Sequence, residues 1–145
     1  MIEYFRNKYK RKIYDKIIEY CKINYEEISY PNNIKKGIGM FNCRCQHNAI
    51  QQIYDGKMDK AYLCICVDDN SNEPFIHFIN KKGEYYIDNT LGYMYKDYTY
   101  YIIREVKHKD FRNMDKLLID SKELYVNMFS NYMLRKLFKI TKNII

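Results

Sequence analysis

Residues 60–69 read KAYLCICVDD, and this short apolar stretch decides the fold class. Its apolar residues alternate between two sides, with Tyr62, Cys64 and Cys66 on one and Leu63, Ile65 and Val67 on the other. Successive side chains of a strand point to opposite faces, so a strand that is apolar on both faces must be covered on both. The stretch therefore predicts a central strand of a sheet.

Three further strands are predicted downstream of it. They are residues 75–80 (FIHFIN), 84–90 (EYYIDNT) and 98–106 (YTYYIIREV). The first two are separated only by KKG, which favours a tight hairpin turn between antiparallel neighbours. A four-stranded, antiparallel arrangement is therefore the simplest sheet that these segments can form.

Helices are predicted on both sides of the strand region. Residues 2–24 carry apolar side chains every three or four positions, and residues 45–54 show a shorter helical pattern that ends at Gly56. Between these two helices, 29–33 (SYPNN) predicts a chain break and 35–40 (KKGIGM) a loop. After the last strand, residues from about 115 to 140 return to a helical pattern, with Ser121 as the expected N-cap.

The whole chain of 145 residues is expected to be one domain. Its core is predicted to span residues 36–106, flanked by the helices 2–24 and about 115–140. The order of elements indicates an α+β fold, with a small antiparallel sheet packed against helices on one side.

Composition narrows the classes of protein. A hydrophobic content of 47% excludes a disordered chain, and no apolar run approaches the roughly 20 residues of a membrane span. The first twenty residues are interrupted by charges, so they lack a signal-peptide core. We therefore expect a cytoplasmic protein without a membrane partner, whose five cysteines are reduced thiols.

The net charge of +7 is concentrated at the two ends of the chain. Basic residues outnumber acidic ones in the first twenty positions, and the last fifteen contain four basic residues and no acidic one. If the terminal helices lie side by side, they form a basic surface for an acidic partner protein or a nucleic acid. The alternative is an ordinary solvated helix face.

Three residues have the types and the order of a thiol-dependent catalytic site. Cys45 opens a predicted helix, where free N–H groups and the helix dipole stabilise a thiolate. His77 lies inside a strand, and Asp88 closes the next strand across the KKG turn. A carboxylate beside an imidazole fixes its tautomer and stabilises its protonated form, as a Cys–His–Asp triad requires.

These residues carry a resemblance. The sequence resembles the transglutaminase-like and papain-like cysteine superfamily, in particular its small bacterial and phage members, in two places. The first is Cys45 with Asn48 and Ala49 three and four residues later, and the second is the stretch 76–92, IHFINKKGEYYIDNTLG. The resemblance implies a helix-plus-sheet core with Cys45, His77 and Asp88 as the triad. Asn89 stands where these families commonly have proline before the residue that matches Thr90.

Several alternatives remain open around this segment. Cys43 is a second candidate nucleophile, although Cys45 has the better helix-start position. Asn42, Asn48 and Thr90 are candidates for an oxyanion or supporting role. A zinc site could be drawn from Cys43, Cys45, His47, Cys64 and Cys66. Single-residue spacing between cysteines is unlike the common zinc knuckles, so we expect no metal and no other cofactor.

Two functions follow from this interpretation. The first is a cysteine-dependent hydrolase or acyltransferase that acts on an amide, isopeptide or thioester of a protein or peptide-like substrate. The second is a catalytically inactive, phage-like or bacterial binding module on the same fold, which sequesters a host protein or a small ligand.

Overall fold

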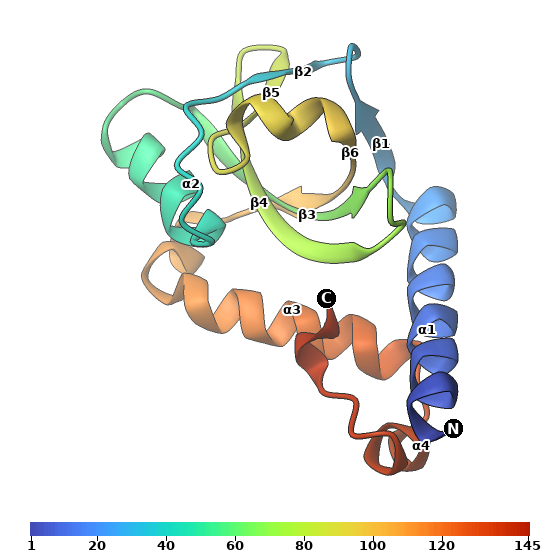
Figure 1. The fold of residues 1–145 in the computed structure, drawn as a ribbon. Coiled ribbons are helices and arrows are strands. Elements are labelled where there is room, and N and C mark those ends of the chain that lie inside the picture. Colours follow the sequence, from blue (N-terminus) through green and yellow to red (C-terminus); the bar gives the residue numbers. More distant parts are fainter.

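The fold is known from a computed structural model that describes residues 1–145. It is α+β, with one curled six-stranded sheet and helices packed against it (Figure 1). The strands are β1 (Glu26–Ser29), β2 (Ile34–Lys36), β3 (Lys60–Asp68), β4 (Pro74–Lys82), β5 (Tyr85–Asp88) and β6 (Tyr98–Glu105). Their order across the sheet is β1-β6-β3-β4-β5-β2. The central position expected for residues 60–69 is confirmed.

The sheet is mixed rather than antiparallel. Four of its pairings are antiparallel, but β2 runs parallel to β5, with Ile34 opposite Tyr86 and Lys36 opposite Asp88. Both edge strands, β1 and β2, fall in stretches that the sequence assigned to no strand. Each is four residues or shorter and contains a single buried side chain, Ile28 or Ile34, so neither shows the alternation that reveals a longer strand.

Three helices cover one face of the sheet. They are α1 (Ile2–Asn24), α2 (Cys45–Tyr54) and α3 (Met114–Met128). Their buried residues, such as Ile17, Ala49 and Val126, share one hydrophobic core with Leu63 and Phe78 of the sheet. The bounds predicted for the first two helices are confirmed, as is the placement of the helices on one side.

The opposite face of the sheet has its own smaller core. Cys64, Cys66 and Tyr100 lie there with residues of both edge strands, and Tyr95 of the 3-10 helix Gly92–Asp97 closes it. The curl of the sheet brings these elements over the concave face (Figure 1). β3 is thus buried on both faces, as its sequence predicts.

The single C-terminal helix predicted for about 115–140 is wrong in two respects. α3 begins at Met114 and ends at Met128, and a separate helix, α4 (Tyr132–Leu137), follows a break. Ser121 lies in the middle of α3, where its hydroxyl donates to the Leu117 carbonyl, so it is not an N-cap. The helix with a side-chain cap is α4, where Asn131 accepts from the N–H groups of Met133 and Leu134 in the first turn.

None of the helices combines the length and apolar character needed to cross a membrane.

The pairing of β4 creates the space for the site. β5 pairs only with Asn80–Lys82, so the earlier part of β4 has no strand on that side. α2 packs there instead, and the Asn80 side chain fixes it by donating to the Ala49 carbonyl at 2.8 Å. The first turn of α2 consequently lies beside the unpaired edge of β4, which contains His77.

Candidate active site

The structure brings Cys45, His77 and Asp88 together. They come from the first position of α2, the middle of β4 and the end of β5, and they are 8%, 3% and 0% exposed. His77 Nε2 lies 2.8 Å from Asp88 Oδ2. The imidazole has only two nitrogens, so Nδ1 is the one that remains for the thiol of Cys45, and each of these two groups shifts the pKa of the other.

Asp88 is held by four hydrogen bonds. Its Oδ2 accepts from His77 and from the Tyr100 hydroxyl, each at 2.8 Å, and its Oδ1 accepts from the backbone N–H groups of Thr90 and Leu91, each at 2.9 Å. Burial raises the pKa of this carboxyl, but the charge of His77 and these donors outweigh burial and lower it. Asp88 is therefore ionised and fixed in orientation.

The electrostatics favour a thiolate–imidazolium pair. Burial lowers the pKa of His77, but the negative charges of Asp88 and Cys45 outweigh it and raise that pKa to about 10. Burial raises the pKa of the Cys45 thiol, yet the His77 charge, its hydrogen bond and the backbone N–H of Phe78 lower it overall. Phe78 can supply that N–H because its edge of β4 has no strand partner.

The start of α2 offers backbone donors beside the thiol. The N–H groups of His47 and Asn48 bond the Arg44 carbonyl, whereas no acceptor engages those of Cys45 and Gln46. Two N–H groups at a helix start, next to a nucleophile, can stabilise negative charge on a carbonyl oxygen under attack.

The supporting residues predicted from the sequence form a network behind the nucleophile. Asn42 and Asn48 exchange side-chain hydrogen bonds at 3.1 and 2.8 Å, and Asn48 also donates to the Thr90 hydroxyl at 2.9 Å. Asn42 lies outside the cavity that contains Cys45, whereas Thr90 lines it. The network joins α2 to the segment after β5 and so fixes Cys45 relative to Asp88.

Asn89 has a structural role of its own. Its side chain donates to Asn80 at 2.9 Å and accepts from the Ile38 N–H at 3.2 Å, which links β4 to the loop before α2. Gly37 in that loop lies against Asp88, so a Cβ there would come within 2.2 Å of the Asp88 carbonyl oxygen. Both residues hold the loop in contact with the end of β5.

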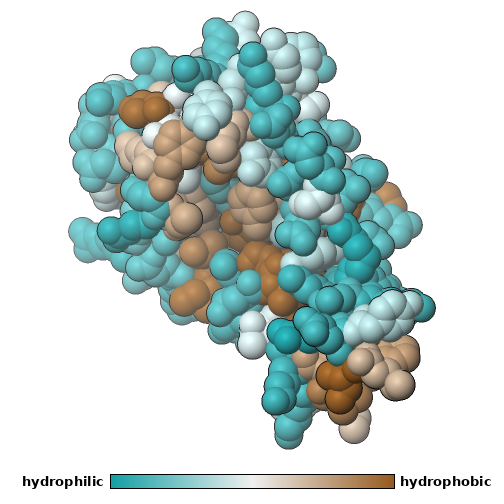
Figure 2. All heavy atoms as spheres, viewed as in Figure 1, coloured by the Kyte–Doolittle hydropathy of each residue, from teal (hydrophilic) through white to brown (hydrophobic).

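A cavity of about 370 Å³ opens at the thiol. Bulky apolar side chains form most of its wall: Phe41, Phe75, Ile76, Leu91, Met94, Leu118 and Ile145. Hydrophobic atoms gather in this region between the sheet and α3 (Figure 2). Cys45 and His77 therefore lie on the wall of a largely apolar cavity, an environment that strengthens charge interactions.

None of the remaining candidates is hydrogen-bonded to a side chain of this pair, although Cys64 lies opposite His77 in the sheet and its thiol donates to the His77 carbonyl at 3.4 Å. Cys43 lines the same cavity but is exposed, and it has the left-handed backbone conformation with φ of 55°. His47 points outward to Asp115, with Nε2 2.7 Å from the carboxylate. Cys64 and Cys66 lie in the core of the opposite face, and no group of three histidine, cysteine or acidic side chains is arranged to hold a metal ion.

The sequence did not reveal Tyr100 or Gln46. Tyr100 lies opposite Cys66 in the sheet, and that register was needed to see that it faces Asp88. Gln46 is buried, lies 3.8 Å from the Cys45 sulfur and donates to Asp115 at 2.9 Å. A buried polar residue at the second position of a predicted helix was the only available signal for it.

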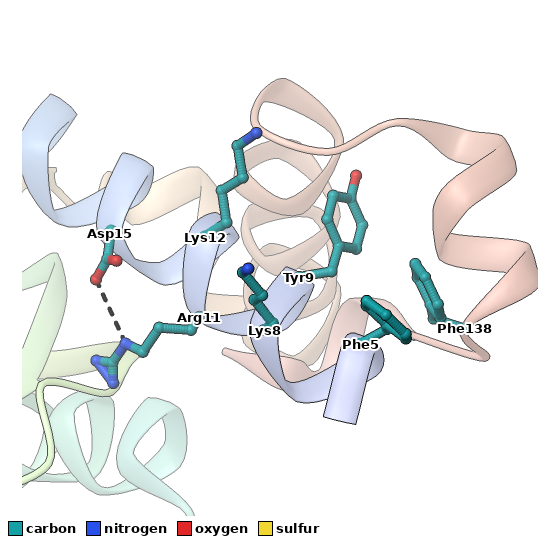
Figure 3. Close-up of a pocket in the computed structure, with 7 residues that line it drawn as sticks. All are labelled: Phe5, Lys8, Tyr9, Arg11, Lys12, Asp15 and Phe138. Atoms are coloured by element: carbon teal, nitrogen blue, oxygen red, sulfur yellow. Dashed lines mark hydrogen bonds and ion pairs between the residues drawn. The ribbon is translucent and has the colours of Figure 1, made fainter. Parts of the chain in front are cut away.

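A larger groove lies far from the thiol, between the first half of α1 and the segment after α4. It has a volume of about 590 Å³, with Phe5, Tyr9 and Phe138 as its aromatic wall and Lys8 and Lys12 beside them (Figure 3). The Tyr9 and Phe138 ring centroids are 5.8 Å apart, so the two terminal regions are in contact.

Comparisons with protein-family models, with curated proteins and with solved structures find no match for this chain.

Proposed function

We propose that this protein is a cysteine-dependent hydrolase or acyltransferase that acts on an amide, isopeptide or thioester. The observation that carries the proposal is the buried chain Cys45–His77–Asp88, with 2.8 Å between His77 Nε2 and Asp88 Oδ2 and the thiol at the start of a helix. The proposed reaction agrees with the transglutaminase-like and papain-like resemblance of the sequence and needs no cofactor.

In the first half of the reaction, the Cys45 thiolate attacks the substrate carbonyl carbon and forms a carbon–sulfur bond. The carbonyl oxygen takes the negative charge and accepts hydrogen bonds from the N–H groups of Cys45 and Gln46. The tetrahedral intermediate then collapses, the bond to the leaving group breaks, and His77 gives its proton to that group. A thioester on Cys45 and a neutral imidazole remain.

In the second half, water or an amine attacks the thioester. Neutral His77 takes a proton from this nucleophile, the carbon–sulfur bond breaks, and the thiolate–imidazolium pair is restored. Asp88 keeps its charge throughout and stabilises the imidazolium, and Tyr100 holds Asp88 through its hydroxyl. Tyr100 is thus a positioning residue rather than a catalytic one.

Trapping of the acyl-enzyme tests this proposal without knowledge of the natural substrate. The protein is incubated with nitrophenyl esters of acyl groups of increasing size, and the adduct is mapped by mass spectrometry. We expect an acyl group on Cys45 that hydroxylamine removes, that persists in Cys43→Ala and that is absent in Cys45→Ala. An adduct that depends on Cys43, or none on Cys45 with any ester, would reject the proposed nucleophile.

A second candidate function, binding of an acidic protein segment, is favoured by the groove of Figure 3. Many of the exposed apolar side chains of the molecule lie near this groove, at the start of the chain with the first turn of α1 and on α4: Met1, Ile2, Tyr4, Phe5, Tyr132, Met133, Leu134 and Leu137. Apolar anchors next to basic side chains fit an acidic, amphipathic segment better than a nucleic-acid duplex, whose backbone is bound mainly through charge.

A direct binding measurement separates these partners. An acidic peptide with aromatic residues should bind the wild-type chain, and both Lys8→Glu with Lys12→Glu and Phe138→Ala should weaken it. Binding of an oligonucleotide that depends on the lysines but not on Phe138 would indicate a nucleic-acid surface instead.

A further inference from the structure

We propose that the substrate of the Cys45 site combines a bulky apolar group with an anionic group, and that Lys122 binds the anion. This inference rests on the proposed function and names the chemical class of its substrate.

The apolar requirement comes from the cavity wall. Its seven bulky apolar side chains come from five separate parts of the chain, including Phe75 of β4, Leu118 of α3 and the last residue, Ile145. At about 370 Å³ the cavity holds a group much larger than a few waters, since one water takes about 30 Å³ in the liquid. A polar group placed against these seven side chains would lose its hydration without gaining partners.

The anionic requirement comes from a single side chain. Lys122 is the only lysine, arginine or acidic residue of the lining, and it is half-buried. Lys122 takes part in none of the ion pairs of the structure, and its sequence neighbour Glu123 is bound to Lys142 at 3.2 Å. A partly desolvated ammonium without a counter-ion, on the wall of an otherwise apolar cavity, favours a ligand that brings the negative charge.

One apolar residue of the wall, Leu118, and the cationic residue, Lys122, lie on the same face of α3. Leu118 and Lys122 are four residues apart in the helix, so their side chains are neighbours on its surface. An apolar group that packs on Leu118 therefore sits beside the ammonium, and one molecule can satisfy both. A carboxylate on an aromatic or branched aliphatic acyl group has this shape.

Three thiol reagents of graded structure test the inference. Iodoacetamide is small and neutral, iodoacetanilide adds a phenyl ring, and 4-(iodoacetamido)benzoate adds a carboxylate to that ring. All proteins carry Cys43→Ser, so that Cys45 is the reacting thiol, and each rate is divided by the rate with free cysteine. We expect the normalised rates to rise from the first reagent to the third.

Matched variants assign the effect to its residues. Lys122→Gln should lower the benzoate-to-anilide ratio by about fivefold, as expected for loss of one partly screened charge. Lys57→Gln, an exposed lysine elsewhere, should leave that ratio unchanged. Leu118→Gln should lower the rates of both aromatic reagents relative to iodoacetamide, and Leu124→Gln on the exposed side of α3 should not.

An unchanged ratio in Lys122→Gln, or an equal fall in Lys57→Gln, would overturn the role of Lys122. Equal normalised rates for the three reagents in the wild type would overturn the substrate class. Failure of the proposed function is a separate result, because it shows as an ordinary pH profile of Cys45 with iodoacetamide. The ratios between reagents stay measurable in that case.

Discussion

Replacing Asp88 with Asn removes one charge and keeps the shape of the side chain. The Asn Oδ1 can still accept from the N–H groups of Thr90 and Leu91, which leaves its Nδ2 facing His77 and Tyr100. An NH₂ group cannot accept a proton from Nε2–H, so His77 must give up that proton and place the remaining one on Nδ1. The imidazolium thus loses its partner.

The size of the effect follows from the geometry. Two opposite charges about 4 Å apart interact by about 4 kcal/mol at the effective dielectric of a protein site, which corresponds to about three pKa units. A fall of this size brings the pKa of His77 down from about 10 to about 7, so near pH 8 most of His77 is neutral in the variant and no longer stabilises the Cys45 thiolate. Thiol alkylation near pH 8 should slow by about one order of magnitude.

The assay is the rate of iodoacetamide alkylation of Cys45 in a Cys43→Ser background, measured from mildly acidic to alkaline pH. Asp97→Asn is the matched control, because it removes the same charge at an exposed position. Loss of a partner for a buried ion costs about 3 to 5 kcal/mol, so a melting curve must show that the Asp88→Asn protein is folded. Equal alkylation rates in two folded proteins would refute the role assigned to Asp88.

Three other outcomes are expected. Tyr100→Phe removes one donor to Asp88, so melting curves should show a loss of stability of about 1.5 to 3 kcal/mol, and alkylation of Cys45 near pH 8 should slow less than in Asp88→Asn. Acyl transfer should decline as pH rises through about 10, because His77 then loses the proton that the leaving group needs. The stability that comes from this raised pKa should be complete below about 6.5 and fall progressively up to about pH 10. Rates and melting temperatures that do not change with pH would count against the raised pKa. Elemental analysis should find no stoichiometric zinc, and one equivalent that disappears on replacing Cys64 and Cys66 would show that the metal assignment is wrong.

Much of the fold could be predicted because its longer elements carry strong periodic signals. α1, α2 and β3 follow their sequence patterns closely, since each buries a continuous apolar face. The edge strands could not be found, because their stability comes from hydrogen bonds to β5 and β6 rather than from their own side chains. The break after Met128 is likewise set by the packing of the C-terminal segment on the core, where Ile140 and Ile145 are buried.

In the candidate site, too, local sequence patterns predicted some residues, whereas others could be found only from the tertiary structure. Residue type and order suggested Cys45, His77 and Asp88, because each lies at a position where local structure favours its chemistry. The sequence could not predict partners that depend on tertiary structure. Tyr100 depends on the register of strands across the sheet, and Lys122 reaches the cavity through the packing of distant helices. Local motifs select the reacting groups, and tertiary contacts determine what surrounds them.

The ionisation state of Cys45 tests the central claim most directly. The ultraviolet absorbance of a thiolate, taken as the difference between the wild-type protein and Cys45→Ser, follows this state across the pH range without any substrate. We expect the thiolate signal to be present already below the ordinary cysteine pKa of about 8.5, because His77 is protonated beside the thiol. A signal that develops only above pH 8 would contradict the thiolate–imidazolium pair and the catalytic function built on it.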